Sequence, residues 1–135
     1  MMKDKVALVT GASKGFGAAL SVLLAEKGYH VLLLSKQKKP LQETDDKIRG
    51  IGGNATIIPF DLRQIQLIDS LIVSIAGRFS SLDLLVLNAA HLGQLRPLTH
   101  TTDEGWGDCL SVNLTAHFKL LRGLKPLLLN AGKSE

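Results

Sequence analysis

The chain has 135 residues, is 45% hydrophobic and carries a formal net charge of +4. The length and the hydrophobic content predict one domain spanning residues 1–135 and exclude a disordered segment. The excess of positive charge is compatible with binding to an anionic ligand, nucleic acid or a membrane surface, and equally with a surface that only keeps the protein soluble. The single cysteine, Cys109, excludes an internal disulfide and indicates a cytoplasmic protein. Because no apolar run approaches the roughly 20 residues of a membrane span and no His/Cys cluster has metal-ligand spacing, we expect neither a membrane segment nor a metal site.

Short apolar runs alternate along the chain with longer segments of helical periodicity. In chain order they predict a strand at 5–10, a helix at 16–27, a strand at 31–34, a helix from 40 to the glycines at 50–53, a strand at 56–60, a helix from 65 to the glycine at 77, a strand at 84–87, and a helix from 104 or 106 to 130. Pro59 favours an edge position or a strand end, and Pro126 is a candidate kink. One face of the last helix carries the apolar residues Leu110, Leu114, Phe118 and Leu121.

The predicted strands are uniformly apolar rather than alternating between apolar and polar residues. Strands that are buried on both faces have this composition, as in a parallel sheet covered by helices. No internal repeat or linker interrupts the alternation of strands and helices. The sequence therefore predicts an α/β fold.

A glycine-rich turn directly follows the first predicted strand and opens the first helix, in the segment Thr10-Gly11-Ala12-Ser13-Lys14-Gly15-Phe16-Gly17. Gly11 would let the chain turn sharply, Gly15 would let the backbone approach a pyrophosphate, and Gly17 would let helix and sheet pack closely. The N–H groups at the start of the helix would attract phosphates. The alternative is a flexible turn without a ligand.

This segment resembles the signature of the short-chain dehydrogenase/reductase family. Further positions agree with the family in order and spacing: Asp61, Asp83, Asn88-Ala89-Ala90, and Asn113 within Ser111-Val112-Asn113-Leu114-Thr115. Leu87 and Ala90 depart from it, since the family often has Asn and Gly there. The resemblance covers residues 5 to about 130 and implies a Rossmann-like doubly wound parallel sheet, truncated after about four strands.

The resemblance also implies the site residues. Asn113 would be the catalytic-site asparagine, and Asp61 would contact an adenine ring, unless Asp61 is a plain loop residue or a helix N-cap. The implied cofactor-binding residues are Thr10, Gly11, Ser13, Lys14, Gly15, Phe16, Gly17, Ser35, Lys36, Asp61, Leu62, Asn88, Ala89 and Ala90.

The end of the second strand bears on the choice of cofactor. NAD binders usually carry an acid about 20 residues after the glycine turn, but the segment here is Ser35-Lys36-Gln37-Lys38-Lys39. Lys36 would attract a 2′-phosphate, Lys14 is a second cation, and Ser35 could donate its hydroxyl to the same group. We therefore favour NADP(H), with NAD(H) possible; the alternative is that these lysines are simply solvated.

The family transfers hydride between a nicotinamide and a carbonyl or alcohol substrate with Asn, Ser and a Tyr-x-x-x-Lys unit. Of this set we find Asn113 alone, because Leu33 stands four positions after the single tyrosine, Tyr29. His91, near the expected nicotinamide, is a weak candidate for an acid or base. The sequence thus predicts an NADP(H)-dependent oxidoreductase whose chain as given is inactive alone; the alternatives are a non-catalytic dinucleotide-binding or dimerisation module and a non-functional remnant.

The expected partners are a small carbonyl or alcohol molecule and a second copy of the chain, and we expect no nucleic acid. The fourth strand would be an unpaired edge, which tends to recruit a partner. The leucines within residues 120–129 are a candidate patch for a homo-oligomer. Alternatively, this helix simply packs on its own sheet.

Overall fold

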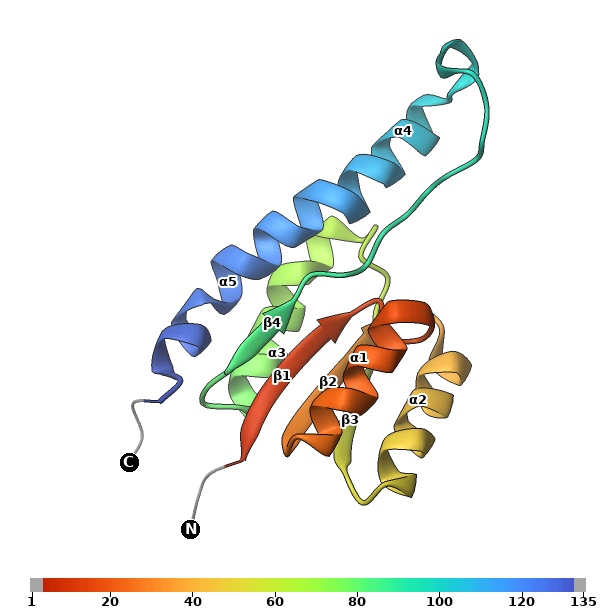
Figure 1. Ribbon diagram of the computed structural model, residues 1–135. Coiled ribbons are helices and arrows are strands. Elements are labelled where there is room, and N and C mark those ends of the chain that lie inside the picture. Colours follow the sequence, from red (N-terminus) through yellow and green to blue (C-terminus); the bar gives the residue numbers. More distant parts are fainter. Residues whose placement is uncertain (1–3, 133–135) are drawn as a thin grey trace.

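The computed structural model describes residues 4–132, so the ends of the predicted domain, 1–3 and 133–135, lie outside the described residues. Strands and helices alternate along the chain, as the sequence predicts (Figure 1). The elements are β1 (Lys5–Thr10), α1 (Gly15–Glu26), β2 (Tyr29–Ser35), α2 (Lys38–Gly50), β3 (Asn54–Pro59), the 3-10 turn η1 (Ile65–Leu67), α3 (Ile68–Arg78), β4 (Leu84–Val86), the 3-10 turn η2 (Leu98–His100), α4 (Asp103–Leu110), the π-turn η3 (Ser111–Thr115) and α5 (Ala116–Asn130).

The strands form one parallel sheet in the order β3-β2-β1-β4. The chain therefore proceeds outward from β1 to β3 and then returns to place β4 on the other side of β1. Ligands of such sheets bind at the carboxyl ends of the strands, where the order reverses. Pro59 ends the edge strand β3, as predicted, and pairs in register with Ser35.

Helices cover both faces of the sheet (Figure 1). Alternate residues of β1 belong to opposite cores. Val6 and Leu8 pack on the side of α3 and α5, whereas Ala7 and Val9 pack on the side of α1 and α2. All four side chains are buried. This arrangement confirms the doubly wound α/β fold and explains the uniform apolar composition of β1.

Asp83 fixes the start of β4 against β1. Its Oδ2 atom accepts a hydrogen bond from the backbone N–H of Val6 at 2.8 Å, and its own N–H donates to the Val6 carbonyl, also at 2.8 Å. A buried strand needs partners for its backbone groups, and β4 is only three residues long. Asp83 thus fixes the register in which β4 begins beside β1.

The last helical segment is not one regular helix, as the sequence predicted, but α4 and α5 joined by a π-turn. The irregularity lies at Ser111–Thr115, whereas α5 continues through the candidate kink at Pro126. Single π-turns insert one extra residue into a helix and often occur at functional sites. No helix within residues 4–132 combines the length and the apolar character that a bilayer crossing requires.

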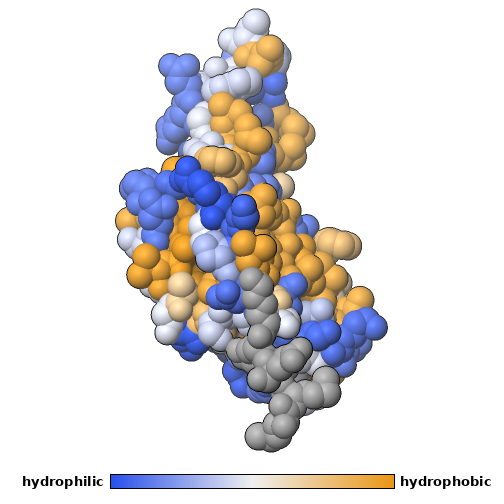
Figure 2. Space-filling model, turned by 90° about the vertical axis from the view of Figure 1, so that its left-hand side faces the viewer, coloured by the Kyte–Doolittle hydropathy of each residue, from blue (hydrophilic) through white to orange (hydrophobic). Residues whose placement is uncertain are grey.

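The apolar face predicted on this segment exists, but it is exposed. Leu114 and Phe118 are 64% and 58% accessible, and Leu110 and Leu121 are exposed beside them. Figure 2 shows apolar surface that extends from the body of the molecule onto its narrower arm. The face that packs on the sheet is different and consists of Val112, Ala116, Leu120, Leu124 and Leu127.

The candidate partner patch at residues 120–129 is divided between two faces of α5, and its residues Leu121 and Leu129 are exposed. Leu120, Leu124 and Leu127 are buried in the core of their own sheet, so they are not available to a partner. Other exposed apolar side chains continue from Leu121 toward the start of the segment, through α5, the π-turn and α4. We call Leu110, Leu114, Phe118 and Leu121 the exposed stripe.

Candidate functional site

Thr10 joins the turn after β1 to the loop after β4. Its hydroxyl oxygen accepts hydrogen bonds from the backbone N–H groups of Asn88 and Ala89, both at 2.9 Å, and its O–H donates to the Val86 carbonyl at 3.3 Å. The Thr10 side chain is fully buried. It therefore lies beneath the turn and holds the two loops together.

The glycines of the turn permit a fold that side chains would prevent. Gly11 and Gly15 have φ values of +68° and +57°, in the left-handed region that side chains rarely adopt. A Cβ on Gly17 would overlap the carbonyl of Gly11 and the amide of Asn88. Gly11 thus turns the chain sharply, as predicted, whereas the close contact of Gly17 is with the turn and Asn88.

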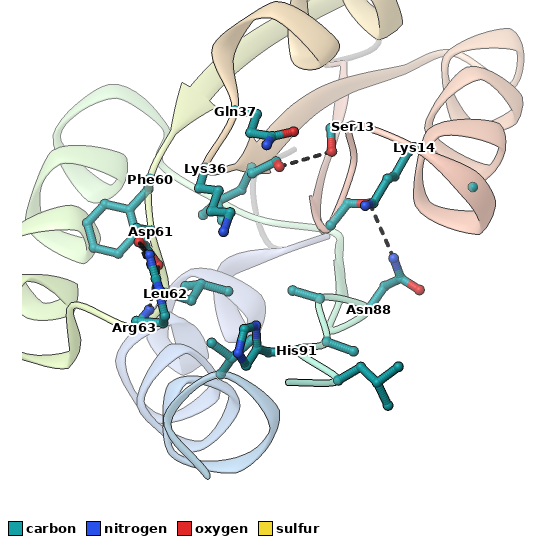
Figure 3. A pocket seen from close by; sticks show the side chains of 18 of the residues that line it. Ser13, Lys14, Lys36, Gln37, Phe60, Asp61, Leu62, Arg63, Asn88 and His91 are labelled. Atoms are coloured by element: carbon teal, nitrogen blue, oxygen red, sulfur yellow. Dashed lines mark hydrogen bonds and ion pairs between the residues drawn. The ribbon is translucent and has the colours of Figure 1, made fainter. Parts of the chain in front are cut away.

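A pocket of about 660 Å³ lies at the carboxyl ends of the strands (Figure 3). Its walls come from the turn after β1 and from the segments that follow β2, β3 and β4, together with the π-turn. The lining residues are Gly11, Ser13, Lys14, Gly15, Leu34, Ser35, Lys36, Gln37, Phe60, Asp61, Leu62, Arg63, Asn88, Ala89, Ala90, His91, Leu92, Gly93 and Val112. Segments that are far apart in the sequence therefore meet at the edge where the strand order reverses.

Two lysines give one side of this pocket a positive charge. Lys14 lies in the turn, and Figure 3 shows Lys36 extending into the pocket between Asp61 and Ser13. Within residues 4–132 neither lysine forms an ion pair. The hydroxyl of Ser35 donates to that of Ser13 at 3.0 Å, so two further polar groups join β2 to the turn. This side of the pocket is suited to an anionic group.

Asp61 and Arg63 form a close ion pair in the loop after β3, beside Lys36 (Figure 3). Arg63 Nη2 lies 2.7 Å from Asp61 Oδ2, and Nε lies 3.1 Å from both carboxylate oxygens. The hydrogen bonds from Arg63 lower the pKa of Asp61, and the partial burial of the carboxyl group opposes this shift less strongly. Asp61 is therefore a carboxylate at neutral pH.

The sequence model of the short chain dehydrogenase family matches residues 5–135, which is nearly the whole chain. The chain belongs to the short-chain dehydrogenase family. The glycine turn, the sheet order and the position of the pocket agree with this membership.

Two curated relatives in this family illustrate the extent of the similarity. The chain is 35% identical over 119 residues to a short chain dehydrogenase/reductase of Colletotrichum higginsianum, covering 88% of this chain and 44% of the relative. It is 34% identical over 134 residues to a fatty acyl-CoA reductase of Mycobacterium tuberculosis, covering 97% of this chain and 45% of the relative. The chain thus spans less than half the length of these relatives.

Solved short-chain dehydrogenase structures share the fold. A metagenomic short-chain oxidoreductase in complex with NADP superposes with a TM-score of 0.89 at 31% identity, over 94% of this chain and 57% of that chain. L-sorbose reductase from Gluconobacter frateurii, complexed with NADPH and L-sorbose, superposes with a TM-score of 0.86 at 28% identity. The match covers 97% of this chain and 50% of the reductase. Carveol dehydrogenase from Mycobacterium avium, in complex with NAD, superposes with a TM-score of 0.82 at 25% identity. The match covers 96% of this chain and 51% of the dehydrogenase.

Asn113 lies in the π-turn and binds the backbone of the loop after β4. Its Oδ1 atom accepts from the N–H of His91 at 2.7 Å, and its Nδ2 atom donates to the His91 carbonyl at 2.9 Å. Both polar atoms of the side chain are used in this way. Asn113 therefore fixes the loop beside the pocket, and its side chain does not line the pocket itself.

The pocket brings together most of the residues that the short-chain dehydrogenase pattern implies. Gly11, Ser13, Lys14, Gly15, Ser35, Lys36, Asp61, Leu62, Asn88, Ala89 and Ala90 line it. Thr10, Phe16, Gly17 and Asn113 do not. Thr10 and Gly17 are buried under the turn, and Phe16 is 69% accessible on α1.

Other lining residues were missed by sequence reasoning. Phe60 and Gln37 stand next to predicted site residues, so adjacency to the strand ends could have identified them. Val112 and Arg63 reach the pocket through tertiary structure, and no local motif marks them. Within residues 4–132 no group of three or more His, Cys, Asp or Glu side chains is placed to bind a metal ion.

Proposed function

We propose that this chain is the cofactor-binding part of an NADP(H)-dependent oxidoreductase that transfers hydride between a nicotinamide and a carbonyl or alcohol substrate. The observation that carries this proposal is the pocket at the switch point of the sheet, with the glycine turn on one side and, beside it, two lysines that form no ion pair with the described residues. Bound nicotinamide cofactor supplies the hydride chemistry, and protein residues supply orientation and electrostatics.

The pyrophosphate would lie against the turn at Gly15. The backbone there has φ +57°, no heavy atom lies within 4 Å of the place where a Cβ would be, and α1 begins at this residue. The free N–H groups and the positive dipole end of a helix N-terminus bind phosphate. A carboxylate at position 15 would repel the same group.

Lys36 supports the preference for NADP(H) over NAD(H). It directly follows β2, where NAD binders usually place an acid, and Lys14 adds a second positive charge. Ser35 offers a hydroxyl from the end of the same strand. Two of the structural relatives described above hold NADP or NADPH and one holds NAD, which agrees with this preference.

Asp61 would lie at the adenine end and Asn88 at the middle of the cofactor. The Asn88 amide donates to the carbonyls of Thr10 and Gly11 at 3.2 and 3.4 Å, so its role is to hold the two loops that flank the cofactor. Asn113 would hold the loop at His91, near the nicotinamide. The Ser and Tyr-x-x-x-Lys of the family are not found among the 135 residues, so we assign no proton transfer to this chain.

A second copy of the chain is the proposed partner of the exposed stripe. Contiguous apolar side chains on one helix face are typical of interfaces between subunits. None of the residues of the stripe lines the pocket. Association through this face would therefore cover none of the lining residues that the stripe itself would have to supply.

Thermal unfolding with and without cofactor tests the proposed function. Saturating NADPH should raise the melting temperature, and NADH should raise it less. Gly15→Asp should abolish the NADPH shift, because it adds a negative charge where phosphate would bind and a side chain at positive φ. Lys36→Asp should weaken NADPH more than NADH, since it removes the expected attraction to the 2′-phosphate.

Gly77→Asp is the matched control for position 15. Gly77 lies in α3, no heavy atom lies within 4 Å of the place of its Cβ, and it does not line the pocket. The control should therefore retain the NADPH shift. If Gly15→Asp binds NADPH as well as the parent chain, the phosphate turn is assigned wrongly. Equal losses of NADPH and NADH binding in Lys36→Asp would contradict the cofactor preference.

A further inference from the structure

Thr44 contacts the glycine turn from α2, although it does not line the pocket. Its hydroxyl donates to the carbonyl of Ala12 at 3.0 Å, across 32 positions of the chain. A threonine in a helix often bonds the carbonyl four residues earlier, but here that contact, with Pro40, is longer at 3.4 Å. Thr44 is only 2% accessible, so little water competes for its hydroxyl. The side chain therefore ties α2 to the turn.

The backbone of Ala12 is held from both sides. Its N–H donates to the Leu34 carbonyl at 3.2 Å, and its own carbonyl accepts from Thr44. The Ala12 carbonyl and the Ser13 N–H belong to one planar trans peptide, so they point in opposite directions. The contact of the Ala12 carbonyl with Thr44 thus also fixes the direction of the Ser13 N–H.

The Ser13 N–H is suited to bind a ligand. It forms no hydrogen bond with residues 4–132, and Ser13 lines the pocket. The Ser13 hydroxyl accepts from that of Ser35 at 3.0 Å (Figure 3), and Lys36 follows Ser35. Ser13 therefore lies beside the residues that we expect to meet a 2′-phosphate. A backbone N–H directed at a phosphate oxygen forms a charge-assisted hydrogen bond.

We propose that Thr44 is a positioning residue for the preference for NADP(H): by holding the peptide between Ala12 and Ser13, it directs the Ser13 N–H at the 2′-phosphate. This inference rests on the proposed cofactor binding and extends it to a side chain outside the pocket. Without the hydroxyl, the buried carbonyl of Ala12 loses its donor, which favours rotation of the peptide. NADH has no 2′-phosphate, so its binding does not depend on this N–H.

The test compares the dissociation constants of NADPH and NADH, measured by isothermal titration calorimetry at one salt concentration. A hydrogen bond to a charged group contributes roughly a tenfold factor in affinity or more. We therefore expect Thr44→Val to weaken NADPH binding at least about fivefold and NADH binding less than about twofold. Thr44→Ser keeps the hydroxyl and should keep both constants within about twofold of the parent values.

Thr56→Val is the matched control. The Thr56 hydroxyl is also partly buried and lies 2.8 Å from His30 Nε2, but Thr56 is on β3 and does not line the pocket. Its removal should leave the ratio of the two dissociation constants unchanged, even where the melting temperature falls. A change of ratio confined to Thr44→Val is a result that general destabilisation would not produce.

The parent chain allows a second measurement that needs no variant. In ¹H–¹⁵N spectra, the amide proton of Ser13 should shift downfield when NADPH binds, because a hydrogen bond to a phosphate oxygen deshields the proton. NADH should shift it clearly less. This comparison decides the role of the Ser13 N–H if Thr44→Val does not fold.

Two results would overturn the role of Thr44. One is an equal loss of NADPH and NADH affinity in Thr44→Val, or no loss of either. The other is a shift of the Ser13 amide proton that is the same with both dinucleotides. In either case the proposed function would stand as long as the parent chain binds NADPH and Gly15→Asp does not. Failure of the parent chain to bind NADPH would instead reject the proposed function itself.

Discussion

Replacing Thr10 by valine tests whether the buried hydroxyl under the pocket holds the two loops together. Valine has nearly the same shape, but it cannot accept the hydrogen bonds from the N–H groups of Asn88 and Ala89 or donate to Val86. Both N–H groups would then lack a partner in a partly buried place. An unsatisfied donor of this kind costs about 1–3 kcal/mol.

We expect Thr10→Val to lower the free energy of unfolding by about 2–3 kcal/mol. This value is near the low end of the cost of two unsatisfied donors, because water can reach partly buried groups. For a chain of this size that corresponds to a fall in melting temperature on the order of 10 °C. Urea denaturation followed by circular dichroism measures the free energy, and the slope with denaturant checks that the folded state remains compact.

Thr115→Val is the matched control for this prediction. Thr115 lies at the end of the π-turn, is partly exposed, and its side chain forms no hydrogen bond with residues 4–132. The control should change the free energy of unfolding by less than about 0.5 kcal/mol. If Thr10→Val lowers the free energy of unfolding no more than the control does, the hydroxyl does not join the loops in the way we describe.

Two further predictions concern the Asp61 pair and the exposed stripe. Because Arg63 lowers the pKa of Asp61 below the usual 3.8, the pair should contribute stability above about pH 4 that is lost as the pH falls through the lowered pKa. Asp61→Asn should therefore show a smaller fall in melting temperature on acidification than the parent chain, and parallel curves would contradict this. Phe118→Lys should reduce the molar mass in light scattering from that of an assembly to that of one chain, because it places a charge in the exposed stripe. A parent chain that already scatters as a single chain, or a variant that stays assembled, would reject the proposed homo-oligomer.

The sheet was predictable from the sequence because each strand is a short apolar run between strong turn signals. Lys5–Thr10 needed no correction, since the charged and glycine residues on either side fix its limits. The other boundaries moved by up to three residues, the most at α3, where the predicted helix from 65 begins with a 3-10 turn. The glycine turn was predictable for a related reason, because all its residues are adjacent in the chain.

The π-turn could not be predicted in this way. Its sequence, SVNLT, has ordinary helical periodicity, and the helix opens where Asn113 binds the backbone of His91, on the loop after β4. Arg63 presents the same difficulty. Its pairing with Asp61 is local, but its approach to Asp108 depends on where α4 lies against the loop after β3.

The exposed stripe shows a different limit, since helical periodicity identifies apolar faces without saying which one packs. The last helical segment has two of them. One runs through Leu110, Leu114, Phe118 and Leu121, and the other runs through Val112, Ala116, Leu120, Leu124 and Leu127. The second face has alanine at position 116, fully buried, which lets the helix lie close to the sheet. Close packing at this small residue favours the second face, and the side chains of the first face remain outside, where a second chain could cover them.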